Sequence, residues 1–165
     1  MECDNKVLFV SGGTGTFGQE FIKRCLKEGN PKEIIIFTRD ELKQSMMKKI
    51  FPPKKYPLKY VIGNVREEKR IMENMKGVDI VIHAAALKHI PICEENPMES
   101  VKTNILGTAN IVKCASLNNV EKFILLSSDK AVYPVNVYGS SKMCGEKITL
   151  NENKNNNKTK FSCVL

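Results

Sequence analysis

The stretch that decides the fold is Lys6-Val7-Leu8-Phe9-Val10-Ser11-Gly12-Gly13-Thr14-Gly15-Thr16-Phe17-Gly18. An apolar run typical of a buried strand ends in three glycines spaced three residues apart. Apolar residues at helical spacing then continue as far as Leu26. Between a strand and a helix, such glycines allow a tight turn, a close approach of the main chain to a pyrophosphate, and close packing of helix on strand.

The amino end of this first helix strengthens the interpretation, because it offers free N–H groups and a positive dipole end to a diphosphate. A glycine triplet alone also occurs in ordinary surface turns, so its place between a strand and an amphipathic helix carries the argument. We therefore predict a dinucleotide-binding turn with ligand contacts from Gly12, Thr14, Gly15, Thr16, Phe17 and Gly18.

Beyond this unit, strand-like and helix-like runs alternate along the chain. Further strands are expected at residues 33–37, 58–62, 79–82, 122–126 and 161–165. Helices are expected after Asp40, over 67–75, from Pro97 onward, and around Lys142, with a low-complexity loop at about 151–159. This alternation implies right-handed crossovers. We predict one α/β domain over residues 1–165, a doubly wound Rossmann-type parallel sheet with its site at the carboxyl ends of the strands.

The end of the second strand is where such a fold selects its cofactor. An acid there binds the ribose of NAD, whereas an arginine accommodates the 2′-phosphate of NADP. This chain has Thr38-Arg39-Asp40, with Lys43 one helical turn further on. Two cations and a hydroxyl beside one acid favour NADP over NAD. The alternative for Arg39 is a surface ion pair with Asp40 or Glu41.

The second informative stretch is Ser127-Ser128-Asp129-Lys130, followed by Tyr138 and Lys142. A tyrosine four residues before a lysine on a helix lies on the same face, one turn away. There the ammonium can lower the pKa of the phenol, so that Tyr138 can take a proton from a sugar hydroxyl beside a nicotinamide. Asp129 and Lys130 can act as acid and base if burial raises one pKa and lowers the other. The alternative is an ordinary surface ion pair.

Composition limits the remaining possibilities. The net charge is +8, but the lysines are spread over the chain without interleaved aromatic residues, so we expect no nucleic-acid partner. No apolar run approaches the roughly 20 residues that span a bilayer, so we expect no membrane partner and a cytoplasmic protein. The six cysteines include no Cys-x-x-Cys pair, and only two histidines are present, so we expect reduced thiols and no metal site.

Together these motifs resemble the extended short-chain dehydrogenase/reductases, and among them the inverting UDP-N-acetylglucosamine 4,6-dehydratases of the polysaccharide biosynthesis protein family. The resemblance covers nearly the whole chain. It rests on residues 12–18, 38–44, 83–89, 96–99, 102–104 and 128–131 and on Tyr138-Gly139. It implies an NADP-dependent lyase that converts a UDP-sugar to a 4-keto-6-deoxy product, with inversion at carbon 5, for glycan biosynthesis. Homo-oligomers are expected by resemblance alone.

The resemblance also implies a role for each matching residue. Tyr138, assisted by Lys142 and the hydroxyl of Ser128, would act at the carbon 4 hydroxyl. Asp129 would be the acid and Lys130 the base of the elimination. Ser128 stands where the family more often has threonine, and a hydroxyl is kept.

Further contacts are expected around these catalytic residues. Lys88 is expected to reach cofactor or sugar, Ser127 and Ser128 to contact the sugar, and Ala84, Asn64 and Val65 to line the cofactor site. The family has aspartate where this chain has Asn64, which weakens the expected adenine contact. Asn104 is a candidate for a proton relay near Tyr138 or a packing group in its helix. We expect His83 to be structural, whereas His89, in a Lys88–Pro91 loop, could line the sugar pocket.

Length separates this chain from the family it resembles, whose enzymes are about twice as long and have a carboxyl-terminal lobe for the UDP moiety. We therefore expect a chain that lacks this substrate lobe, holds NADP and turns over UDP-sugar poorly. Two other interpretations stay open. The protein could be a nucleotide-sugar 4-epimerase of the same superfamily, or a non-catalytic NADP-binding module.

Overall fold

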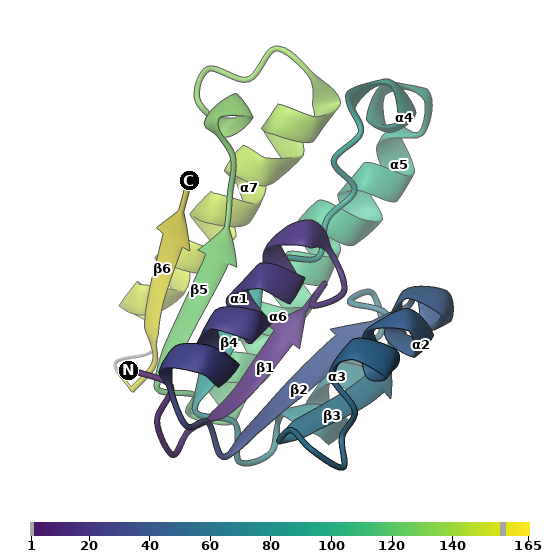
Figure 1. Ribbon diagram of the computed structural model, residues 1–165. Coiled ribbons are helices and arrows are strands. Elements are labelled where there is room, and N and C mark those ends of the chain that lie inside the picture. The colour runs from purple at the N-terminus through teal and green to yellow at the C-terminus, as the bar shows by residue number, and fades with distance from the viewer. Residues whose placement is uncertain (1, 156–157) are drawn as a thin grey trace.

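The computed structural model describes residues 2–155 and 158–165 (Figure 1). Its centre is a six-stranded parallel sheet in the order β3-β2-β1-β4-β5-β6. The strands are β1 (Val7–Ser11), β2 (Glu33–Thr38), β3 (Leu58–Ile62), β4 (Ile80–His83), β5 (Lys122–Leu126) and β6 (Lys160–Val164). The direction of winding reverses between β1 and β4, which is the point where doubly wound sheets bind ligands. The predicted fold class is confirmed.

Helices cover both faces of the sheet. The longer ones are α1 (Thr16–Glu28), α2 (Glu41–Ile50), α3 (Glu68–Met75), α6 (Gly107–Leu117) and α7 (Val137–Asn151). The shorter elements are α4 (Ile90–Glu95), α5 (Pro97–Ser100), the π-helical η1 (Val101–Leu106), and the 3₁₀ turns η2 (Asp129–Ala131) and η3 (Glu152–Lys154). In Figure 1, α1 and α2 lie on the near face of the sheet.

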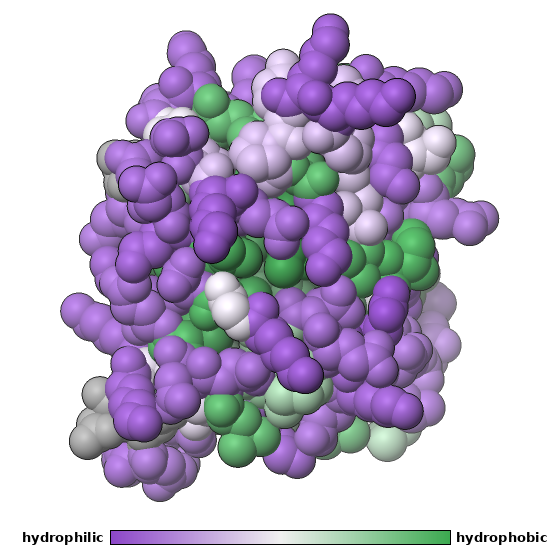
Figure 2. Space-filling view, turned by 90° about the horizontal axis from the view of Figure 1, so that it is seen from below, coloured by the Kyte–Doolittle hydropathy of each residue, from purple (hydrophilic) through white to green (hydrophobic). Residues whose placement is uncertain are grey.

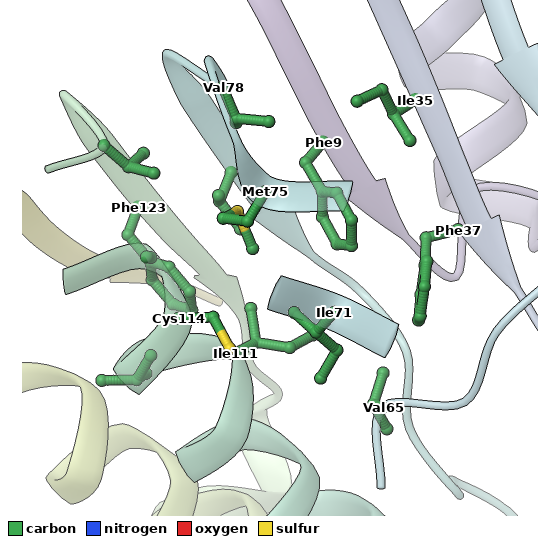
Figure 3. Close-up of a cluster of buried hydrophobic side chains, with 14 of the residues drawn as sticks. Phe9, Ile35, Phe37, Val65, Ile71, Met75, Val78, Ile111, Cys114 and Phe123 are labelled. Carbon is green, nitrogen blue, oxygen red and sulfur yellow. The ribbon is translucent and has the colours of Figure 1, made fainter. Parts of the chain in front are cut away.

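Two apolar clusters form because successive strand residues point to opposite faces. Leu8 and Val10 pack with the residues of α1 and α2, whereas Phe9 packs with α3 and α6. Figure 3 shows the second cluster, in which Phe9 meets Met75 and the rings of Phe9 and Phe37 lie 5.1 Å apart. Burial on both faces explains why the strands read as nearly continuous apolar runs.

The amino-terminal edge of the sheet presents a mainly hydrophilic surface (Figure 2). Along the described chain, none of the helices combines the length and apolar character that a bilayer crossing requires. The residues predicted to bind ligands or to take part in catalysis follow the carboxyl ends of the strands, on the opposite side.

The helix predicted to start at Pro97 is present, with one difference. Its backbone passes through the π-helical η1 before continuing as α6, and the N–H of Gly107 bonds to the carbonyl of Lys102, five residues back. Thr108 Oγ1 also donates to the carbonyl of Asn104 at 2.7 Å. Such π turns inside α-helices are frequent at functional sites.

Two predicted loops are partly helical. Residues Lys88–Pro91 were expected to form a loop, but α4 begins at Ile90, with Pro91 in its first turn, where its missing N–H costs nothing. In the segment 151–159, Asn151 ends α7 and η3 follows, and Asn153 exchanges two hydrogen bonds of 2.9 Å with the main chain of Phe161. Residues 156–157 of that predicted loop lie outside the described residues.

Candidate active site

A cavity at the carboxyl edge of the sheet brings together the glycine turn, the end of β2, the end of β4 and the start of α7. All the residues predicted to bind the cofactor line it: Gly12, Thr14, Gly15, Thr16, Phe17, Gly18, Thr38, Arg39, Asp40, Lys43, Asn64, Val65, Ala84, Lys88, Tyr138 and Lys142. Ser127 lines it as well. Segments far apart in sequence therefore meet at the switch point, as the strand order requires.

The glycine turn is packed so tightly that two of its positions leave no room for a side chain. Gly12 has φ of +71°, and a Cβ there would lie 2.8 Å from the main-chain nitrogen of Ala85. A Cβ on Gly18 would lie 2.5 Å from the Cα of Gly13. The cap residue of α1, Gly15, makes no side-chain cap bond, and the first turn holds no acid. The helix N-terminus thus presents uncapped N–H groups and no competing negative charge, which suits a pyrophosphate.

The end of β2 is organised by Asp40. Its carboxylate accepts a hydrogen bond of 2.9 Å from the N–H of Lys43 and so caps α2, and Lys43 Nζ lies 3.4 Å from its other oxygen. The main-chain bond from Lys43 is the chief reason why the pKa of Asp40 lies below its usual value. Arg39 is exposed and lines the cavity, and within residues 2–155 and 158–165 it forms no salt bridge, although its charge helps to lower the pKa of the neighbouring Asp40.

Tyr138 and Lys142 stand on the first turns of α7, which Asn136 caps by accepting a 2.8 Å hydrogen bond from the N–H of Gly139. Tyr138 is 8% exposed and Lys142 is 4% exposed. The Lys142 ammonium donates to the carbonyl of Leu126 at 2.6 Å. Burial lowers the pKa of Lys142 to about 8. The spacing predicted the shared face, whereas the carbonyl partner of the ammonium could not be read from the sequence.

Ser127 leads to a residue that the sequence reasoning missed. Its hydroxyl donates to a carboxylate oxygen of Glu146. Glu146 lies four residues after Lys142 on α7, so both side chains occupy one face of the helix. That four-residue spacing was the available signal.

Ser128, Asp129 and Lys130 are not among the residues that line the cavity. Lys130 Nζ lies 3.1 Å from Asp129 Oδ1, and Ser128 Oγ donates to the same oxygen at 3.0 Å. The side chain of Asp129 is 82% exposed and that of Lys130 is 45% exposed. The hydrogen bond from Lys130, followed by that from Ser128, holds the pKa of Asp129 below its usual value.

The condition set for an acid role, that burial raises the pKa of Asp129, is therefore not met in this structure. The η2 turn directs both charged side chains outward, where they pair with each other and with solvent. The surface ion pair given as the alternative is the observed arrangement. An acid role for Asp129 would require a change of surroundings, because an exposed, hydrogen-bonded carboxylate stays ionised at neutral pH.

Asn104 and His83 form buried hydrogen bonds that connect the elements around the cavity. Asn104 donates to the carbonyl of Leu87 and accepts from its N–H, both at 2.8 Å, and donates to Ser141 Oγ at 2.9 Å. His83 lies between Ser11 Oγ, at 2.6 Å, and a threonine hydroxyl of α6, and burial lowers its pKa to about 3. Asn104 thus holds the main chain of Leu87 against α7, and His83 joins side-chain hydroxyls of β1 and α6. His89, the other histidine, is exposed and does not line the cavity.

Two further polar residues brace the cofactor end and were not singled out from the sequence. The buried amide of Gln44 donates to the carbonyls of Val61, at 2.8 Å, and Thr38, at 3.3 Å, and so ties the ends of β2 and β3 together. Arg66 donates to Glu99 and Thr103 of the π-containing helix. Sequence periodicity does not reveal such polar residues, because their hydrogen-bond partners lie in elements that are distant along the chain.

Comparison with known proteins shows which family the chain belongs to. The chain is 45% identical over 161 residues to the UDP-N-acetylglucosamine 4,6-dehydratase (inverting) of Campylobacter jejuni, covering 96% of this chain and 48% of the relative. It is 47% identical to the UDP-glucose 4-epimerase of Rickettsia bellii, covering 97% and 48%. The X-ray structure of Pen from Bacillus thuringiensis superposes with a TM-score of 0.94 at 36% identity, covering 99% and 52%.

The chain thus spans about half the length of the relatives that it matches. The family model described as polysaccharide biosynthesis protein matches residues 8–165, which is nearly the whole chain. On these matches and on the fold they share, the chain belongs to the polysaccharide biosynthesis protein family.

Proposed function

We propose that this chain is the cofactor-binding half of an NADP-dependent UDP-N-acetylglucosamine 4,6-dehydratase that inverts carbon 5. The observation that carries the proposal is the shared cavity. One continuous lining includes a phosphate-type glycine turn, the cationic end of β2 and the buried Tyr138–Lys142 pair. A dinucleotide laid along it would have its pyrophosphate at α1 and its reactive ring beside Tyr138.

NADP is proposed over NAD because of how the end of β2 is used. The Asp40 carboxylate already caps α2 and pairs with Lys43, so a ribose 2′-hydroxyl would have to share its oxygens with these two contacts. Arg39 lines the cavity and is exposed, and Thr38, the residue before it, lines the cavity as well. A guanidinium and a hydroxyl are a suitable pair of donors for a 2′-phosphate.

When bound, the nicotinamide supplies the transient oxidation of the sugar at carbon 4 and the later reduction at carbon 6. The residues of this chain handle the protons. Tyr138 takes the proton of the carbon 4 hydroxyl, and the buried ammonium of Lys142 stabilises the phenolate. Asp129 gives a proton to the leaving carbon 6 hydroxyl, while Lys130 accepts the proton of carbon 5.

The acid and base roles need a drier setting than the present exposure of Asp129 and Lys130 provides. A bound sugar would separate the two charges and exclude water from them. Loss of the Lys130 hydrogen bond and partial burial would both raise the pKa of Asp129 toward the range that an acid requires. The roles are therefore proposed for the substrate complex.

A nucleotide-sugar 4-epimerase is the second candidate, because a relative with 47% identity carries the name UDP-glucose 4-epimerase. An epimerase needs no acid and base for elimination, so the adjacent Asp129 and Lys130 favour the dehydratase. Incubation with UDP-N-acetylglucosamine and mass analysis of the product separates the two. A loss of 18 mass units, one water, supports the dehydratase, whereas an unchanged mass with a new 4-epimer supports the epimerase.

A further inference from the structure

At the wall of the cavity, three polar side chains from the end of β5 and from α7 interact with one another. The hydroxyl of Ser127 follows β5, and the ammonium of Lys142 and the carboxylate of Glu146 stand one turn apart on α7. Ser127 and Lys142 line the cavity, but Glu146 does not. Glu146 is therefore placed to act on a ligand only through the two residues in front of it.

The first link is the hydrogen bond from Ser127 to Glu146. A hydroxyl has one proton and two lone pairs, and an ionised carboxylate only accepts. With its proton directed at Glu146, Ser127 presents lone pairs to the cavity. The main chain at this position is held as well, since the N–H of Ser127 donates to the carbonyl of Val164 at 2.7 Å. Ser127 is thereby set to accept a hydrogen bond from a hydroxyl or amide group of a ligand.

The second link is electrostatic. Burial destabilises the ammonium of Lys142, and the negative charge of Glu146 acts in the opposite direction. The other titratable groups near the ammonium are Cys163 of β6, His83 of β4 and Tyr138 of α7. Burial raises the pKa of Cys163 to about 11 and lowers that of His83 to about 3, so both are neutral at pH 7. Glu146 is the group in this set that carries a negative charge.

Charged groups on the other elements packed against α7 are exposed or engaged elsewhere. Asp129 and Lys130 of η2 pair with each other, and Glu94 of α4 accepts from the N–H of Val137. Exposed or paired side chains on the remaining neighbours and on α7 itself are Glu95, Glu99, Lys102, Lys113, Lys147, Glu152, Lys154 and Lys160.

We propose that Glu146 is a positioning residue of this site, which holds Ser127 as a hydrogen-bond acceptor and stabilises the buried ammonium of Lys142. The inference rests on the proposed function for its consequence in binding and turnover. Its two physical links, however, are properties of the free chain. They can be measured without cofactor or substrate.

The primary test is a direct titration of Lys142 by NMR, using ¹³C-labelled lysine and Lys142→Arg to assign the signal. In the intact chain the midpoint is expected at about 8. Glu146→Gln keeps the shape and removes the charge, so the midpoint is expected to fall to about 7. Glu146→Asp keeps the charge at a greater distance and should give an intermediate value. Glu73→Gln removes an exposed carboxylate on α3 that pairs with Arg70, and should leave the midpoint unchanged.

A second readout follows both links through ligand binding. In Glu146→Gln the amide can donate to Ser127, so the serine proton is free to turn toward the cavity. Because the midpoint of Lys142 is expected to fall in the same variant, affinity for NADP, measured by calorimetry, should begin its high-pH decline about one pH unit earlier than in the intact chain.

The outcomes divide cleanly. A lysine midpoint that stays within 0.3 of the intact value in Glu146→Gln, with an unchanged amide spectrum, would overturn the inference. If Glu146→Gln fails to fold, Glu146→Asp and Ser127→Ala decide, because a positioning role requires that Asp shift the midpoint and that Ala not shift it. A shifted midpoint without any NADP binding supports the inference about Glu146 and contradicts the proposed function.

Discussion

Replacing Gly12 by alanine should damage the site far more than the same change at Gly77. Both glycines have a positive φ, +71° and +73°. A Cβ at Gly12 would lie 2.8 to 2.9 Å from three main-chain atoms of Ala84 and Ala85, whereas a Cβ at Gly77 meets nothing within 4 Å. Gly77→Ala therefore measures the backbone strain alone, and the comparison isolates the steric overlap at the cavity.

The magnitudes follow from these contacts. A residue with a side chain in the left-handed region costs about 1 to 2 kcal/mol, which is the whole expected loss for Gly77→Ala. Overlap with main chain that cannot rotate away adds about 1 to 3 kcal/mol, so Gly12→Ala should lose about 2 to 5 kcal/mol. The strand ends of β1 and β4 must also separate, which misplaces the phosphate-binding N–H groups.

Urea denaturation followed by circular dichroism measures the stability loss, and calorimetry measures NADP affinity. Gly12→Ala should lower affinity at least tenfold at temperatures where it is still folded, and Gly77→Ala should bind like the parent chain. Equal losses of stability for the two variants would refute the reasoning, because the steric term would then be absent. Normal NADP affinity in folded Gly12→Ala would refute the placement of the pyrophosphate.

Three more predictions follow from the site. Arg39→Ala should lower NADP affinity about 10- to 100-fold, because one charge-assisted contact is lost, and should leave NAD affinity unchanged. The control variant Arg70→Ala, on α3, should change neither affinity when both are measured by calorimetry. Tyr138→Phe, in a protein that carries both halves, should retain NADP affinity and abolish formation of keto sugar; retained turnover would disprove the tyrosine's role. The pKa of Lys142 is about 8 in the folded chain and about 10.4 in the unfolded chain. Between these two pH values the unfolded chain binds more protons than the folded chain. The contribution of Lys142 to the free energy of unfolding therefore rises by about 3 kcal/mol from pH 8 to 10.4. Parallel urea curves of the intact chain and Lys142→Met should diverge by that amount, and parallel behaviour across this pH range would contradict the burial argument.

Local patterns were sufficient to predict most of the fold. Strand and helix periods can be recognised within a single element, and the helix expected after Asp40 is α2, whose first residue is Glu41. The π turn at η1 was not predictable, because its hydrogen bond joins the main chain of Gly107 to that of Lys102 and requires no particular side chain. The start of α4 was missed because Pro91 reads as a loop residue when its first-turn position is unknown.

In the candidate site, too, some residues could be predicted from the sequence and others could not. Residues on strand ends and on one helix face, such as Arg39, Tyr138 and Lys142, meet because parallel strands share an edge, and the sequence predicts this. Glu146 acts through a contact with Ser127, nineteen residues away, that no spacing rule specifies. The exposure of Asp129 was missed because burial depends on what covers η2, and that is a property of the whole assembly of elements.

The claim on which the account depends is that this cavity binds NADP. Calorimetric titration of the 165-residue chain with NADP and with NAD, at pH 7 and equal ionic strength, tests it most directly. We expect one site per chain and an affinity for NADP at least ten times that for NAD, set by Arg39. Binding of NAD as tight as that of NADP, or no binding of either nucleotide to the folded chain, would contradict it.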